Sequence, residues 1–287
     1  MEEEIKKLNE AKKISDKILE FAKSLIKKDV KIVEIAESIE SKIRELGGGV
    51  AFPVNISINE NAAHYTPSIN DETILKVGDI VKIDFGVHVD GYIWDRAFSV
   101  SIDKDECELI EAAKDALENA IKCIRPGVKV CEISQVIEES IRKYEVNPIY
   151  NLCGHGLKRF VQHAEPTIPN CKNNIRYEIK EGEVIAIEVF TTNGQGWVKE
   201  SGETLIYKYE TDKPVRMREA RIIMEMAKKE FMKLPFAKRW IKSVVGGAVL
   251  DMALKQLVEI GSIRAYPVLK EESGGKVAQA EETIIVM

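Results

Sequence analysis

The chain has 287 residues, which suits one large domain or two modest ones. Hydrophobic residues make up 45% of the chain and charged residues 31%, a balance that excludes a mainly disordered, collagen-like or coiled-coil protein. The formal net charge of −5 argues against a protein that binds nucleic acid through bulk charge. The five cysteines form no CxxC pair, so a zinc finger is unsupported. No apolar run is long enough to span a membrane and the N-terminus lacks an apolar signal core, so we expect a cytoplasmic protein.

The N-terminal segment is predicted to form two helices. Apolar residues recur at helical spacing over 5–25 and again over 32–43, with Lys and Glu between them. Three glycines at 47–49 end the second helix.

A β-hairpin is predicted next, within a strand-rich segment over 52–102. Its first strand is an alternating apolar run at 81–89, and the pair Asp90-Gly91 is a strong signal for a two-residue turn. Residues 92–100 are expected to form the returning strand.

The rest of the chain alternates between helical and strand patterns. In chain order we predict helices over 106–124 and 130–144, strands with loops over 149–168 and 183–192, a mostly helical block over 213–260, and a final strand over 277–286. Strands before and after a helical block indicate an insertion into a mixed sheet domain.

Two acids lie in the apolar strands of the hairpin. The predicted turn places Gly86 opposite Asp95, and Asp84 shares the face of Gly86, so the two acids become diagonal neighbours about 7 to 8 Å apart at the backbone. Two such carboxylates repel each other and lose hydration, so they need compensation. We expect Lys82 and Arg96 to point to the other face, which favours a cation bound between the acids.

Other side chains of metal-binding type occur in similar surroundings. Glu188 and Glu281 each lie in a predicted apolar strand, where an acid is uncommon unless it is paired or binds a metal. One such acid is easily a buried salt bridge, but four in one chain favour ligands. His155 lies between two glycines, where the backbone can approach a ligand closely. His64 and His163 are not specific when taken singly.

The order and spacing of five segments resemble those of methionine aminopeptidases of the type 2 class. The segments are Phe52-Pro53 with AAHYTP at 62–67; KIDFG at 82–86 with Asp95; Gly154-His155-Gly156 with His163; Ala186-Ile187-Glu188; and Gln279-Ala280-Glu281. The resemblance implies an α+β fold, the pseudo-two-fold pita-bread fold, in which a curved antiparallel sheet is flanked by helices. It implies one catalytic domain over 1–287 with an inserted helical subdomain over 205–265. The segment that resembles this insertion carries LPFAKRW at 234–240 and is followed by Tyr266-Pro267.

The resemblance also implies two divalent metal ions, for which cobalt, manganese, iron and zinc all remain open. Their ligands would be Asp84, Asp95, His155, Glu188 and Glu281. Asp84 would hold one ion, Asp95 and Glu281 would bridge both ions, and His155 with Glu188 would complete the other. Two such ions would balance the charge of the four carboxylates.

The implied reaction is removal of the initiator methionine from nascent proteins, with a metal-bridged hydroxide as the nucleophile. Glu188 would carry a proton toward the leaving amine, and His64 and His163 would contact the substrate or stabilise the oxyanion. Phe52 would line the pocket for the methionine side chain, and a small second residue would be preferred. The partners implied are N-termini of nascent polypeptides, with transient proximity to the ribosome. We expect a monomer that binds neither DNA nor membranes.

Two positions depart from the family pattern, and two other functions stay open. Glu282 stands where many relatives have His, and Gln162 stands where an apolar pocket residue is common. A proline-directed peptidase of the same fold is one alternative, but its relatives usually carry a separate N-terminal domain, for which the residues before the first motif are too few. A non-catalytic relative that binds protein or RNA is the other, but such relatives usually lose metal ligands.

Overall fold

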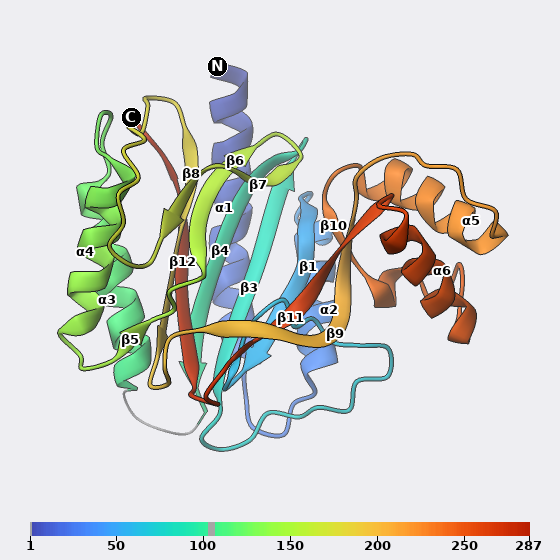
Figure 1. Cartoon of the computed structure of the whole chain (residues 1–287), viewed down its shortest axis with the longest axis horizontal. Helices are drawn as coiled ribbons and strands as arrows, with labels where there is room; N and C mark the ends of the chain where they lie inside the picture. Colours follow the sequence, from blue (N-terminus) through green and yellow to red (C-terminus); the bar gives the residue numbers. More distant parts are fainter. Residues whose placement is uncertain (1, 103–106) are drawn as a thin grey trace.

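The computed structural model describes residues 2–102 and 107–287 and contains two antiparallel sheets (Figure 1). Residues of both sheets line one cavity. The larger sheet has the strand order β1-β3-β4-β12-β8-β6-β7, with β5 paired to β8, and the smaller has the order β10-β9-β11-β2. The strands are β1 Gly49–Ile58, β2 Asn61–Ala63, β3 Ile80–Val89, β4 Tyr92–Ser101, β5 Asn147–Pro148, β6 Cys153–Lys158, β7 Val161–Pro169, β8 Val184–Thr192, β9 Val198–Tyr209, β10 Pro235–Ala237, β11 Ile263–Glu271 and β12 Val277–Ile285. The α-helices are α1 Glu2–Leu25, α2 Ile32–Glu45, α3 Glu108–Cys123, α4 Val130–Arg142, α5 Arg218–Met226 and α6 Gly247–Glu259; a π-helix covers Ala227–Phe231 and a 3-10 helix Lys238–Ile241.

The helices α1 and α2 cover the β1-β3-β4 half of the larger sheet. Their buried faces carry isoleucines at helical spacing, and these pack on side chains such as Val81, Ile83 and Phe85 that alternate along β3. The two predicted helices are therefore confirmed, and burial of this apolar stripe stabilises them.

The predicted hairpin is confirmed in its register. In the β3–β4 pair Val89 lies opposite Tyr92 and Gly86 lies opposite Asp95. Because the odd-numbered residues of β3 face the helices, the even-numbered residue Asp84 faces the cavity side of the sheet.

The helices α3 and α4 cover the other half of the larger sheet, over β8 and β12, as Figure 1 shows. The predicted start of the first of these helices at Glu106 lies outside the described residues, and the described helix begins at Glu108. No helix in the described ranges is long and apolar enough to cross a membrane.

The smaller sheet is the part of the fold that the sequence patterns missed. The residues of β9 from 199 to 203 are all exposed, so β9 lacks the alternation of a half-buried strand. The block over 213–260, predicted as mostly helical, contains α5 and α6 but is interrupted by β10. The limits of the proposed subdomain at 205–265 fall inside β9 and β11, which pair with each other.

A buried ion pair connects the helical segment over 213–260, which includes α5 and α6, to α2 in the N-terminal half of the domain. The Arg239 guanidinium bonds the Glu40 carboxylate of α2, and also donates to Thr66 Oγ1 at 2.6 Å. The same carboxylate accepts hydrogen bonds from Trp240 Nε1 at 2.8 Å and from the backbone N–H of Val54 at 3.2 Å.

Candidate metal centre

Neighbouring strands of the larger sheet bring the predicted ligands to one face. Glu281 of β12 lies opposite Glu188 of β8 on one side and opposite Ala97 of β4 on the other, and Ala97 in turn lies opposite Asp84 of β3. These residues form one row across the sheet, because directly paired residues share a face.

Asp95 and His155 lie in the next row of the same face. Asp95 pairs with Gly86, and His155 pairs with Ala186, which is two residues before Glu188. The five side chains come from β3, β4, β12, β8 and β6, so the sheet register alone places them side by side.

One cavity is lined by all of the predicted site residues. They are Phe52, His64, Asp84, Asp95, His155, His163, Glu188 and Glu281. The opposite wall comes from the smaller sheet and includes Ile206, Pro235 and Tyr266.

Phe52 lies beside the acids because its partner in β3 is a glycine. A Cβ added at Gly86 would come within 2.3 Å of the Phe52 ring. The ring therefore lies across the backbone of Gly86, next to Asp95, and forms an apolar wall of the cavity.

The four acids Asp84, Asp95, Glu188 and Glu281, here called the carboxylate cluster, have no lysine or arginine ion-pair partner among the described residues. Two of their buried oxygens, Asp84 Oδ1 and Asp95 Oδ1, accept no hydrogen bond in the described structure. Burial raises the pKa of the Asp84 carboxyl to about 7. Burial together with repulsion from the other acids raises the pKa of Asp95, Glu188 and Glu281 well above their ordinary values. Such a cluster is compatible with ionised carboxylates only if cations lie among them.

The ligand atoms fall into two overlapping groups. Atoms of Asp95, His155 and Glu281 lie within 4.8 Å of one another, and so do atoms of Asp84, Glu188 and Glu281. Glu281 belongs to both groups, and the donor set of carboxylates and one imidazole fits hard or borderline divalent ions. Glu188 groups with Asp84, whereas the resemblance assigns it to the same ion as His155.

Three histidines line the cavity together with the cluster: His64, His155 and His163. His155 Nδ1 donates to the Gly156 carbonyl oxygen at 3.2 Å, which leaves Nε2 unprotonated and facing Asp95 Oδ2 at 3.9 Å. Burial lowers the pKa of His155 to about 4, so the imidazole is neutral and able to bind a metal. The ring of His163 in β7 lies edge-on to the ring of His155, with 4.7 Å between their centroids. His64 Nδ1 donates to the carbonyl oxygen of Pro267 in β11 at 3.1 Å.

His64 also has a positive φ of 63°, which is rare for a residue other than glycine. Such strain persists only where the surroundings hold it, and it concentrates at functional sites. The backbone conformation turns the imidazole into the cavity beside Tyr266, with 5.6 Å between ring centroids.

Three side-chain amides hold the carboxylate cluster in place, and the sequence patterns did not assign them this role. Gln279 Nε2 donates to Glu188 at 3.2 Å and to Glu281 at 3.3 Å. Asn55 donates to Asp84 at 3.3 Å, and Gln162 donates to Asp95 at 3.4 Å. The position of Gln279 could have been predicted from the sequence, because it is two residues from Glu281 and shares its face. The position of Asn55 beside Asp84 could not, because it depends on an irregular register between β1 and β3.

The expectation that Lys82 points away from the acids is wrong. Lys82 is two residues from Asp84 and therefore shares its face, but its ammonium is turned to the carbonyl oxygens of Val277 at 2.8 Å and Asn59 at 3.1 Å. It makes no ion pair with the carboxylate cluster in the described structure.

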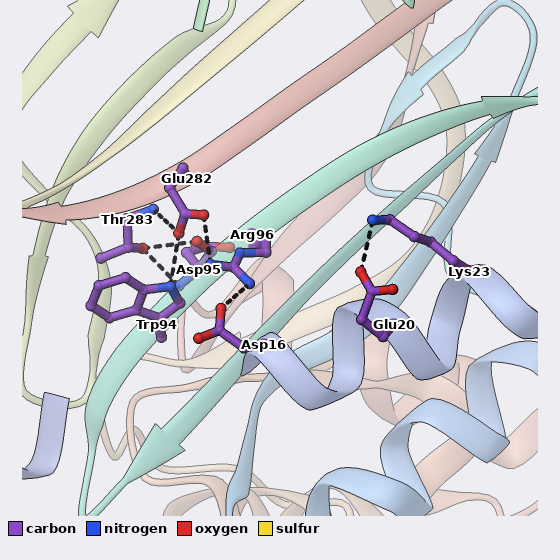
Figure 2. Close-up of polar contacts among 8 residues, drawn as sticks. All are labelled: Asp16, Glu20, Lys23, Trp94, Asp95, Arg96, Glu282 and Thr283. Carbon is purple, nitrogen blue, oxygen red and sulfur yellow. Dashed lines mark hydrogen bonds and ion pairs between the residues drawn. The ribbon is translucent and has the colours of Figure 1, made fainter. Parts of the chain in front are cut away.

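Arg96 and Glu282 lie on the opposite face of the sheet, as Figure 2 shows. Arg96 pairs with Glu282 at 2.6 Å and with Asp16 of α1 at 2.8 Å, and Trp94 Nε1 donates to Glu282 at 2.8 Å. Glu282, which departs from the family pattern, therefore does not line the cavity, whereas Gln162 does.

We expect chelator-treated protein to lose stability as the pH rises above about 6.5 and through the raised pKa values of the carboxylate cluster, of which that of Asp84 is about 7. Carboxyls with a raised pKa hold protons in the folded state that the unfolded chain has already released. For each such extra proton, the free energy of unfolding falls by about 1.4 kcal/mol per pH unit. Below pH about 6.5 the two histidines His155 and His64 act in the opposite sense, so that stability rises with pH. Their pKa values are lowered in the folded state, and the unfolded chain therefore binds protons on these imidazoles more tightly than the folded protein does. Thermal unfolding across this pH range tests the trend, and a melting temperature that stays constant or rises would contradict it.

The chain matches the model of metallopeptidase family M24 over residues 6–259. It is 50% identical over 284 residues to a methionine aminopeptidase of Pyrococcus horikoshii, with 99% of this chain and 96% of that protein covered. A solved structure described as a thermophilic Arx1 superposes with a TM-score of 0.83 at 19% identity, covering 97% of this chain and 87% of that one. A methionine aminopeptidase of Thermotoga maritima superposes with a TM-score of 0.73 at 20% identity, covering 100% and 94% of the two chains. At these identities the two superpositions show the fold alone, and they confirm the expected curved antiparallel sheet with flanking helices.

Proposed function

The chain belongs to metallopeptidase family M24 and, within it, to the methionine aminopeptidases, and we propose that it removes the N-terminal methionine of proteins with two divalent ions held by its carboxylate cluster. One observation carries the proposal. Asp84, Asp95, Glu188 and Glu281 gather without a lysine or arginine partner among the described residues, with the Nε2 atom of His155 turned toward them. Family membership implies the use of a divalent metal, and the sharing of Glu281 between two ligand groups supports two ions rather than one.

Divalent ions bound at the cluster would lower the pKa of a bound water and so supply a nucleophile near neutral pH. The chain's own residues position the other participants. Glu188, half-buried and held by Gln279, is suited to pass a proton toward the leaving amine once its charge is balanced. His163 lines the cavity beside His155 and is placed to donate a hydrogen bond to the developing oxyanion.

His64 is suited to contact the substrate near the scissile bond. Because Nδ1 donates to the Pro267 carbonyl oxygen, the neutral imidazole presents Nε2 as a hydrogen-bond acceptor. Burial lowers the pKa of His64 and so favours this neutral form.

The apolar walls of the cavity suit a methionine side chain. Phe52 comes from the larger sheet, and Ile206, Pro235 and Tyr266 come from the smaller sheet. An apolar pocket of this kind favours methionine over polar residues but rejects isosteres only weakly. The preference for a small second residue is proposed from the resemblance alone.

Further parts of the proposal rest on the resemblance and on composition. We propose a cytoplasmic monomer that acts on nascent polypeptides in transient proximity to the ribosome, with no DNA or membrane partner. The net charge of −5 supports the exclusion of nucleic acid. The inserted helical subdomain over 205–265 likewise remains a proposal.

The proposal predicts a metal-dependent release of methionine. Protein stripped with chelator is expected to release no methionine from a Met-Ala-Ser peptide, and addition of Mn²⁺ or Co²⁺ is expected to restore release. Free methionine is measured by chromatography, with Mg²⁺ as a comparison because its preference for octahedral oxygen ligands suits this histidine-containing site less well. A Met-Leu-Ser peptide tests the preference for a small second residue.

Two other outcomes would contradict the proposal. Cleavage of an Xaa-Pro peptide without cleavage of Met-Ala-Ser would indicate a proline-directed peptidase of the same fold. Failure of every metal to support cleavage would indicate a non-catalytic member of the family.

A further inference from the structure

We propose that two buried hydroxyl groups, those of Thr283 and Ser99, act as positioning residues that set the geometry of the metal centre across the junction of β4 and β12. This inference rests on the proposed function, because it concerns how the chain holds the same ions. Asp95 stands on β4 and Glu281 on β12, so the relative position of these two strands decides the distance between the two acids.

The junction between β4 and β12 has little backbone pairing. It contains two residue pairs, Glu281 with Ala97 and Glu282 with Arg96. By comparison, β3 pairs with β4 along the whole hairpin, and β12 pairs with β8 from Val277 to Ile285. The two halves of the larger sheet, each with its own pair of helices, therefore meet at the shortest of these three strand contacts.

Thr283 bridges the junction on one side of the paired residues. Its hydroxyl accepts a hydrogen bond from the backbone N–H of Asp95 at 2.8 Å and donates to the carbonyl oxygen of Asp95 at 2.8 Å (Figure 2). One side chain thus satisfies both backbone groups of a predicted metal ligand, and Thr283 is 1% exposed.

Ser99 makes the same arrangement on the other side, in the reverse direction. Its hydroxyl donates to the carbonyl oxygen of Gln279 at 2.7 Å and accepts from the backbone N–H of Gln279 at 2.7 Å. The amide of Gln279 in turn donates to both Glu188 and Glu281. Continuing the antiparallel register by two residues in each direction from Glu281 and Ala97 gives these two hydroxyl contacts.

The two hydroxyls replace backbone bonds where the strands diverge. A direct backbone bond would draw the strands together, whereas an inserted hydroxyl holds them apart and still satisfies the buried N–H and C=O groups. Thr283 thereby fixes the main chain of Asp95, and Ser99 fixes the residue that orients Glu188 and Glu281. Metal ligands need placement within about 0.5 Å, so loss of either hydroxyl would disturb the cluster although neither hydroxyl touches a metal.

The test compares Co²⁺ binding to metal-free variants, measured by titration calorimetry and by the visible absorption of bound Co²⁺. Thr283→Val keeps the shape of the side chain and removes the hydroxyl, and Ser99→Ala does the same at the second position. Each is expected to weaken Co²⁺ binding about 10- to 100-fold and to alter the absorption band. Thr283→Ser restores a hydroxyl and is expected to bind Co²⁺ within about twofold of wild type.

Thr191→Val is the matched control. Thr191 is equally buried in β8, but its hydroxyl donates at 2.7 Å to the carbonyl oxygen of Leu109 in α3, on the helix side of the sheet. This variant is expected to lose thermal stability while keeping wild-type Co²⁺ affinity and absorption. It therefore separates the cost of losing any buried hydroxyl from a specific effect on the metal centre.

The outcomes distinguish this inference from the proposed function. Wild-type protein that binds Co²⁺, with Thr283→Val and Ser99→Ala binding it equally well, would overturn the inference and leave the proposed function intact. Equal loss of affinity in Thr191→Val would also overturn it, since the effect would then be one of general stability. Wild-type protein that binds no Co²⁺ would overturn both.

Discussion

Replacing Glu281 by glutamine is expected to lower kcat/KM for a Met-Ala-Ser peptide about 1,000-fold. Glu281 belongs to both ligand groups, so its loss would affect both ions of the proposed centre at once. A metal ion stabilises the charge of the transition state by several kcal/mol. Loss of about 4 kcal/mol of this stabilisation lowers the rate by three orders of magnitude. Steady-state kinetics at saturating Mn²⁺, with the bound metal counted by elemental analysis, measures the effect.

The fold of this variant is expected to be intact. Glutamine has the shape of glutamate and can still accept the hydrogen bond from Gln279, and it removes one charge from a crowded buried cluster. Metal-free Glu281→Gln protein at pH about 8 should therefore unfold no more easily than metal-free wild type.

Glu282→Gln serves as the matched control, because Glu282 is the next residue of β12 and faces Arg96 and Trp94 on the opposite side of the sheet. Its kcat/KM is expected to stay within about threefold of wild type, whatever its stability, because no ligand changes. Wild-type turnover in Glu281→Gln would rule out a ligand role for Glu281.

Replacing Arg239 by methionine is expected to lower the free energy of unfolding by about 3 to 5 kcal/mol. Both partners of the Glu40–Arg239 pair are buried, with side chains 4% and 3% exposed. Removal of the guanidinium leaves the Glu40 carboxylate, among the residues that the structure describes, with the neutral donors Trp240 Nε1 and the Val54 N–H. Urea denaturation at pH 7 measures the loss.

The neighbouring cation provides the control. Lys238 pairs with Asp251 in a contact whose side chains are 26% and 61% exposed, and such exposed pairs contribute about 0 to 1 kcal/mol. Lys238→Met should therefore change stability little. The double variant Glu40→Gln with Arg239→Met should regain part of the loss, because no uncompensated charge remains. If Arg239→Met were as stable as Lys238→Met, the pair would not fasten the helical segment to α2.

Part of the fold follows from single local rules of the sequence. The turn at Asp90-Gly91 set the register of β3 and β4, and the side-chain period of two then placed Asp84 and Asp95 on one face. The same period of two places Lys82 on the face of Asp84, two positions away, so the expectation that Lys82 points to the opposite face is wrong.

The smaller sheet shows where local rules fail. The exposed stretch of β9 over 199–203 has no alternation of apolar and polar residues, so this stretch does not predict a strand. The strand β11 was likewise not predicted from the sequence. Their pairing places Ile206 and Tyr266 opposite the carboxylate cluster, which closes the cavity.

By itself, the sequence determined that β3 and β4 form a hairpin and that Asp84 and Asp95 share one face, because these follow from turn chemistry and a period of two. Only the tertiary structure decided that β12 enters between β4 and β8 and so brings Glu281 beside Asp95, Asp84 and Glu188. That strand order joins residues more than 90 positions apart, and its stability comes from burial of the whole core and from the hydroxyls at the β4–β12 junction. No pattern within a short window of sequence reports such an arrangement.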